Sequence, residues 1–321
     1  MNTFWALFQK VGGKEVLGRY ARAHVLLYSF VMTALLGFSR KSLEIVRLAV
    51  NHRVLGKLRR KYRREITAFR EAQAGDAGAL PRQQSRKVWI CWLQGMEQAP
   101  ALVQRCYASV QTHLADRDIV VLTEENYREY VTFPAFIQQK IDSGVITRTH
   151  LSDLLRLELL IRYGGTWIDA TVFCSGGEIP AYMLEDELFV YQCLKPGLDG
   201  HCTAISSWFM TACTNHPILR LTRHLLYRYW ETHHKLTDYF LLHDFFQLAI
   251  EAYPEEWNRV VPVSNSTPHI LLLRLFEPYD DRVWQAVTAA TPFHKLSYKH
   301  QPEKPSQGRT YYDAVMDKGE V

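Results

Sequence analysis

Apolar and polar positions in the middle of the chain alternate between short apolar runs and helical periodicities. Residues 88–93 (VWICWL) predict a buried strand, residues 101–113 follow a helical pattern, and residues 119–122 (IVVL) predict a second strand. A strand, a helix and a strand in this order form a βαβ unit, which predicts a parallel pair of strands. The pattern therefore predicts an α/β fold.

The same alternation continues toward the C-terminus, and no internal repeat interrupts it. The pattern predicts helices over 134–143 and around Asp153, a strand ending at Asp169, a strand over 187–192, and helices over 216–230 and 238–251. Beyond Tyr298 the chain is polar and contains Pro302, Pro305 and Gly308, so this end is expected to be loose.

The N-terminal quarter has a different pattern. Residues 23–38 are nearly uncharged, and pairs of basic residues flank them (Arg19 and Arg22 before, Arg40 and Lys41 after). This stretch is shorter than the roughly 20 residues that a membrane-spanning helix needs. An amphipathic segment (42–50) and a basic run (57–64) follow it. No small-residue cleavage site follows a basic and apolar start, so we expect no cleaved signal peptide.

Charge separates this region from the rest. The 321 residues have a net charge of +5, but residues 1–87 hold 18 Lys and Arg against 5 Asp and Glu, which leaves the remainder net acidic. An apolar helix followed by a basic run is typical of an interfacial anchor on an anionic membrane surface. A helical hairpin packed on the body, with a solvated basic face, is the alternative. A nucleic-acid partner is not expected, because no recognised nucleic-acid module accompanies the charge.

These patterns predict four regions. They are a basic helical arm with membrane association (1–73), a small-residue linker (74–85), an α/β domain (86–300) and a polar C-terminal tail (301–321). Hydrophobic residues make up 47% of the chain, which is sufficient for a full core. The six cysteines show neither a CxxC pair nor zinc-like spacing, so a reducing compartment is expected.

The segment from 151 to 161 carries the first candidate chemistry. Its leucines and isoleucine keep the predicted helix buried, while Asp153 and Arg156 lie three positions apart on one face. Two interpretations stay open for this pair. It binds a ligand, or it is a helix-face ion pair worth about a few tenths of a kcal/mol.

A double glycine separates this helix from the strand that follows. Gly164 and Gly165 end the helix, because glycine adopts positive φ without steric cost. The same glycines can also allow a ligand to approach the backbone closely. Asp169 then falls at the carboxyl end of the strand, which is the edge where open α/β sheets bind ligands.

The sequences SDLLR at 152–156 and YGGTWIDAT at 163–171 together resemble the capsular polysaccharide synthesis glycosyltransferases. More distantly, they are similar to sugar transferases with the signature Ser-Asp-x-x-Arg followed by Tyr-Gly-Gly-x-Tyr-x-Asp-x-Asp. The resemblance covers residues 86 to about 300 and implies the GT-A nucleotide-sugar transferase fold, a Rossmann-like mixed sheet flanked by helices. Thr171 replaces the second Asp of the Asp-x-Asp motif, as in the capsular group.

The resemblance implies a metal-dependent hexosyltransferase of bacterial type. It would move a sugar from a nucleotide-sugar donor, expected to be a UDP-sugar, to a glycan or lipid-linked acceptor in capsule or other surface polysaccharide synthesis. This work would take place at the cytoplasmic face of the inner membrane, with the protein bound peripherally. A departing diphosphate needs positive charge beside it, and Asp169 is the expected ligand of Mn²⁺ or Mg²⁺. The alternative for Asp169 is a strand-end cap; Thr171 either binds metal or phosphate or points into the core.

The resemblance also assigns further residues to the substrate. Asp153 and Arg156 would bind the donor ribose, sugar or diphosphate, with Gly164 and Gly165 close to the ligand. Trp92, Gln94 and Gly95 follow the first strand, where this fold receives the base and ribose, although Trp92 can equally line the core. The residues after the second strand are weaker candidates for the same role, because they also follow a parallel strand (Thr123, Glu124 and Asn126).

Two later segments complete the candidate site. Asp244, in the helix predicted over 238–251, is a candidate general base for the acceptor hydroxyl, or one of two polar residues on a surface helix. The sequence His294-Lys295-Leu296 resembles the closing Lys-Leu element of the capsular family, and its basic pair would neutralise the leaving diphosphate. The alternative is a basic pair on the surface.

Two other classes of function remain open. A non-catalytic, membrane-associated scaffold with an inactive GT-A domain is suggested by Thr171 alone. A nucleotide-sugar hydrolase can use the same fold. Hydrolysis of the donor without an acceptor would indicate the hydrolase, and absence of donor binding would indicate the scaffold.

Overall fold

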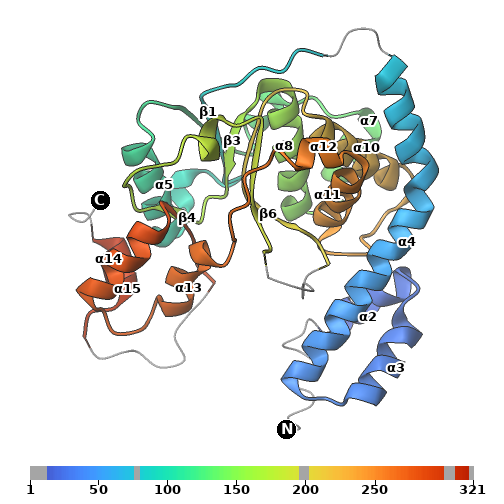
Figure 1. Cartoon of the computed structure of the whole chain (residues 1–321), viewed down its shortest axis with the longest axis horizontal. Coiled ribbons are helices and arrows are strands. Elements are labelled where there is room, and N and C mark those ends of the chain that lie inside the picture. The colour runs from blue at the N-terminus through green and yellow to red at the C-terminus, as the bar shows by residue number, and fades with distance from the viewer. Residues whose placement is uncertain (1–12, 76–79, 195–201, 300–307, 318–321) are drawn as a thin grey trace.

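A five-stranded mixed sheet is the centre of the protein (Figure 1). The computed structural model describes residues 13–75, 80–194, 202–299 and 308–317. The strands stand in the order β2-β1-β3-β6-β5, where β1, β2 and β3 are parallel and β6 is antiparallel to both β3 and β5. Their bounds are Lys87–Cys91 (β1), Asp118–Leu122 (β2), Gly165–Ile168 (β3), Leu188–Gln192 (β5) and Ile205–Ala212 (β6).

Side chains alternate along the strands and build a core on each face of this sheet. On one face Trp89 and Trp167 pack with the leucines of α8 (Arg148–Tyr163), and α10 (Pro217–Thr232) and α11 (Leu241–Ala252) extend this cluster. On the other face the neighbours of Trp89 in β1 pack with α5 (Ala101–His113). The two faces explain why β1 reads as a continuous apolar run.

Short elements connect these layers. They are η1 (Met96–Gln98), α6 (Tyr127–Tyr130), α7 (Ala135–Asp142), α9 (Tyr182–Glu185), α12 (Pro254–Trp257) and η2 (Thr267–His269). The predicted strands and helices are present within a few residues of their expected bounds, and the parallel pairing of β1 with β2 is confirmed. Strand β6 and the elements after residue 260 were not predicted.

A second, two-stranded sheet joins the C-terminal region to the body. β4 (Val172–Cys174) pairs antiparallel with β7 (Phe293–Lys295), which sets Lys295 opposite Val172. Beyond it lie α13 (Ile270–Arg274), α14 (Asp281–Ala290) and α15 (Tyr311–Met316). Tyr311 and Val315 of α15 are buried in this region, so part of the segment expected to be loose is a packed helix.

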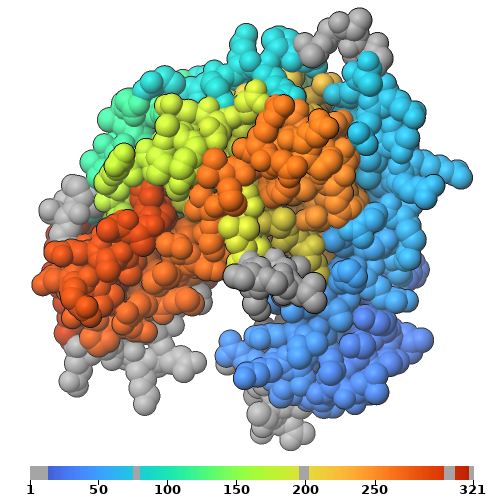
Figure 2. Space-filling view, viewed as in Figure 1, coloured from blue at the N-terminus to red at the C-terminus, as the bar shows by residue number. Residues whose placement is uncertain are grey.

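Three helices precede the sheet: α2 (Gly13–Arg22), α3 (Leu26–Leu36) and α4 (Arg40–Gly75). Helix α4 packs on α10 and α11, with Val50, Val54 and Leu58 among its buried residues (Figure 1). Within the described residues, no helix combines the length and apolarity that crossing a membrane requires. Helices α2 and α3 lie beside the N-terminal part of α4, and this region projects below the body (Figure 1, Figure 2).

The double glycine before β3 is required by close backbone packing. Gly165 has φ of 95°, and a Cβ at this position would lie 2.3 Å from the carbonyl oxygen of Lys87. At Gly164, with φ of 67°, a Cβ would lie 3.1 Å from the carbonyl oxygen of Gln83. Both glycines therefore face protein backbone, which gives them a packing role.

We predict that Gly165→Ala lowers the free energy of unfolding far more than Gly144→Ala. Gly144 also has positive φ (73°), but a Cβ there would meet no atom within 4 Å. The control should cost about 1–2 kcal/mol from backbone conformation alone. Gly165→Ala should add about 1–3 kcal/mol of overpacking against β1. Urea unfolding measures both; equal losses would show that the contact with Lys87 is not limiting.

Candidate active site

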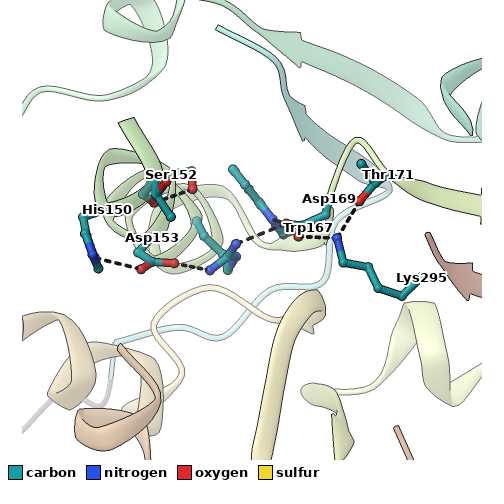
Figure 3. A network of polar contacts seen from close by, with 9 residues as sticks. His150, Ser152, Asp153, Trp167, Asp169, Thr171 and Lys295 are labelled. Carbon is teal, nitrogen blue, oxygen red and sulfur yellow. Dashed lines mark hydrogen bonds and ion pairs between the residues drawn. The ribbon is translucent and has the colours of Figure 1, made fainter. Parts of the chain in front are cut away.

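A row of alternating charges crosses the carboxyl ends of the parallel strands (Figure 3). Asp169 directly follows β3, and the β4–β7 pairing brings Lys295 beside it from a segment more than 120 positions later. Helix α8 supplies Asp153 and Arg156 from the other side. The row therefore runs Asp153, Arg156, Asp169, Lys295, with each carboxylate touching a cation.

Asp169 is the centre of this row. Its Oδ1 accepts hydrogen bonds from Trp167 Nε1 (2.9 Å) and Arg156 Nη2 (3.2 Å), and its Oδ2 accepts one from Lys295 Nζ (3.0 Å). Lys295 also donates to the hydroxyl of Thr171. Burial alone would raise the pKa of Asp169, but Lys295 and Arg156 outweigh it and hold the pKa below its usual value. The carboxylate is therefore ionised and fixed.

The Asp153–Arg156 contact is not a solvated helix-face pair. Arg156 Nη1 donates to Asp153 Oδ1 at 2.7 Å, and the Arg156 side chain is only 4% exposed. Its guanidinium lies 4.8 Å from the centre of the Trp167 ring, a cation–π arrangement. Arg156 Nε is buried and has no hydrogen-bond partner among the described residues. An unpaired buried donor is costly, so an incoming acceptor would satisfy it.

Three residues beside the row were not assigned to the site by the sequence analysis: His150, Tyr239 and His243. His150 Nδ1 lies 3.3 Å from Asp153 Oδ2, and the His150 ring packs edge-on against Tyr239. His243, on α11, has its pKa lowered to about 4 by burial, and Asp153 and Asp169 are close enough for their charges to oppose that shift. The i, i+3 spacing of His150 and Asp153 on one helix was a signal available in the sequence.

The structure does not bring Asp244 or His294 to this row. Asp244 is 3% exposed and lies near Asp238, whose charge adds to burial in raising the Asp244 pKa. His294 is fully buried on the opposite side of β7 from Lys295, where its Nε2 lies 3.0 Å from Ser175 Oγ. Burial lowers the His294 pKa to about 4, so it is a neutral core residue and not a second cation.

The residues that directly follow β1 are the candidates for binding the base and ribose. Trp92 packs edge-on against Tyr298, three residues after Lys295, and its Nε1 is buried without a partner in the described chain. Gln94 is exposed, and Gly95 has φ of 84° in open space.

Beyond β2, Asn126 has a local structural use. Its side chain accepts a hydrogen bond from the Thr123 N–H and donates one to the Val121 carbonyl, which shapes the turn. Glu124 is held through its backbone N–H, which donates to Leu93 O.

The N-terminal arm reaches the edge of this site. The Arg19 guanidinium of α2 lies 6.0 Å from the centre of the Tyr239 ring, and Arg22 Nε donates to Leu236 O at 2.7 Å. Tyr239 in turn contacts His150. Helix α2 thus supports the loop that borders the charge row.

The expected divalent ion does not fit the row as it stands. Both oxygens of Asp169 are engaged by cationic or N–H donors, and Lys295 lies between Asp169 and Thr171 where the ion would need space. Across the described residues, no group of three or more His, Cys, Asp or Glu side chains could hold a metal ion. Hard divalent ions prefer several oxygen ligands. In this row the only carboxylate beside Thr171 is Asp169, and its oxygens already accept hydrogen bonds.

The chain is similar to known proteins at the level of a family, a relative and a solved structure. A family model described as capsular polysaccharide synthesis protein matches residues 38–315. The O-glycosyltransferase braB of Annulohypoxylon truncatum is 26% identical over 169 residues, which are 47% of this chain and 39% of that protein, so the chain spans well under half of that relative. The PaToxG glycosyltransferase structure covers 61% of this chain and 80% of its own, at 18% identity and a TM-score of 0.36.

We predict that Asp244→Asn stabilises the protein increasingly as pH rises. The raised pKa means that the folded state holds this proton more tightly than the unfolded state does. The resulting stability is complete below the unfolded pKa of about 4 and is lost as pH rises through the folded pKa. Relieving the buried carboxylate should be worth about 1–3 kcal/mol at alkaline pH.

Urea unfolding at several pH values from acid to alkaline conditions measures this difference. Asp281→Asn, which changes an exposed carboxylate at the start of α14, is the matched control and should show no such trend. A constant difference between wild type and Asp244→Asn at every pH would contradict the assignment.

Proposed function

This chain belongs to the capsular polysaccharide synthesis protein family, and we propose that it is a glycosyltransferase that uses a nucleotide-sugar donor. The observation that carries the proposal is the partly buried charge row, in which Arg156 and Lys295 lie on either side of Asp169. Two fixed cations at a sheet edge suit a diphosphate, which gains negative charge as the sugar leaves. The mixed sheet, with parallel and antiparallel strands, supports the GT-A fold as part of the same proposal.

Each side chain has a role in this proposal. Lys295 and the unpaired Nε of Arg156 would donate to diphosphate oxygens, and Asp169 would keep both cations in place. Asp153 holds Arg156 from behind. Because these charges are set before the donor binds, little reorganisation is needed when the bond from the anomeric carbon to phosphate breaks.

The remaining residues of the site suit the base, sugar and acceptor. The buried, unpaired Nε1 of Trp92 would donate to the base, for which we propose uracil, beside the aromatic ring of Tyr298. His243 and His150 line the side of the row that faces Tyr239, where sugar hydroxyls need polar partners. The acceptor, a glycan or lipid-linked hydroxyl, would approach from that side.

Replacing Asp153 or Arg156 by Ala should lower turnover at least about a hundredfold, equivalent to roughly 2.7 kcal/mol. Each substitution breaks the support of the diphosphate site and leaves a buried charge unpaired. Donor consumption measures turnover, once with an acceptor mixture and once without acceptor.

Arg274→Ala is the control, because Arg274 and Glu277 form an ion pair of the same spacing and distance (i, i+3, 2.7 Å) at an exposed position. Its turnover should match wild type. If Arg156→Ala also matched wild type, the row would be structural. Donor consumption that does not depend on acceptor would favour hydrolysis.

Lys295→Ala should lower kcat far more than donor affinity, because its ammonium acts mainly on charge that develops in the transition state. Calorimetric donor binding and steady-state kinetics separate the two effects, with Lys299→Ala, on the exposed part of the same segment, as control. A loss confined to affinity would make Lys295 a binding residue only.

The same variant tests the divalent ion expected from the resemblance, which the contacts of Asp169 do not favour. If Mn²⁺ binds Asp169, it must displace the Lys295 ammonium, so Lys295→Ala should bind Mn²⁺ more tightly than wild type does. Asp169→Asn should bind it least. Equal Mn²⁺ affinity in all three proteins would place any ion elsewhere.

A further inference from the structure

Helix α3 presents a continuous apolar face to solvent. Its exposed residues are Leu27 (78%), Phe30 (57%), Val31 (49%) and Leu35 (76%). At 3.6 residues per turn these positions share one side of the helix. Tyr28, Ser29 and Met32 lie on the other side, which faces the core formed with α4. The helix therefore has one packed face and one apolar face without a partner in the described chain.

This exposure is concentrated in one place. Half of the 14 exposed large hydrophobic residues in the described chain lie within residues 27–45. The α2–α3 hairpin that carries most of them projects from the body (Figure 1, Figure 2). Soluble proteins seldom leave a contiguous apolar patch at a projecting tip unless another surface covers it.

Charge around the patch identifies the kind of surface. Residues 13–75 carry 14 Lys and Arg against four Asp and Glu, and Arg40, Lys41 and Arg47 are exposed on α4 directly after the apolar helix. An anionic bilayer complements this combination. A second copy of the chain would bring like charges together around the same patch, which opposes self-association.

We propose that the outward face of α3 docks into the interfacial region of an anionic membrane, with Arg40, Lys41 and Arg47 among the headgroups. Helix α3 has 11 residues and is about 16 Å long, roughly half the thickness of the hydrocarbon core. The helix therefore lies along the bilayer surface. This surface is separate from the charge row, so the proposal does not depend on sugar transfer.

Some basic residues of the run 57–64, which first suggested a membrane, contact the body. Arg59 forms an ion pair with Glu251 of α11 at 2.6 Å, and Lys61 Nζ lies 3.1 Å from His233 Nε2. These two basic residues are engaged by the body. Arg60, Arg63 and Arg64 are exposed. The docking surface centres on α3 and the start of α4 because the exposed apolar residues gather there.

Sedimentation of the full chain with vesicles tests the proposal. Leu27→Ser combined with Leu35→Ser should lower the partition coefficient on phosphatidylcholine vesicles containing about one third phosphatidylglycerol by about tenfold or more. The triple variant Arg40→Gln, Lys41→Gln and Arg47→Gln should lower it by about tenfold or more at low salt, and less at high salt. Wild type should bind pure phosphatidylcholine more weakly.

Leu273→Ser is the matched control, because Leu273 in α13 is also 78% exposed but lies in the C-terminal region. Its vesicle binding should match wild type, and circular dichroism should show all variants folded. Unchanged binding by the Leu27/Leu35 variant, or an equal loss in Leu273→Ser, would overturn the proposal. So would a wild-type dimer that the Leu27/Leu35 variant converts to monomer without any vesicle binding.

Discussion

The ionic contact between Asp169 and its two cations is the constraint on which the site depends. A carboxylate that is 30% exposed and two largely buried cations would each be costly without partners. Together they neutralise one another, and helix α8, strand β3 and strand β7 must meet at one point to bring them together. The packing of α8 on the sheet and the pairing of β4 with β7 are thus prerequisites for the same cluster.

The row holds two carboxylates and two cations, so its formal charges balance. Arg156 divides its hydrogen bonds between Asp153 and Asp169 and still has a buried Nε without a partner. Such incomplete satisfaction is uncommon in protein interiors, and a bound acceptor at the row would satisfy it. It also explains why the proposed function rests on this row rather than on any single residue.

Local periodicity was sufficient to predict β1, β2, α5 and α8, because each has a core-facing pattern within its own residues. The position of Lys295 depended on a pairing across more than 100 residues, where a shift of one position would have exchanged it with His294. Only the resemblance suggested that segment. Which of the neighbouring residues His243 and Asp244 lies beside the row depends likewise on the rotation of α11 about its axis. The sequence does not reveal that rotation.

The contact between α2 and the Tyr239 loop has a consequence for how much of the chain forms the functional unit. The family match begins at residue 38, after α2 and α3, and it contains every member of the charge row. A protein trimmed to the matched residues would nevertheless lose Arg19 above Tyr239 and the Arg22 hydrogen bond to Leu236. The loop that carries Tyr239, which packs against His150, would then face solvent where α2 now covers it. The residues that match the family model and the residues that enclose the candidate site therefore begin at different places in this chain.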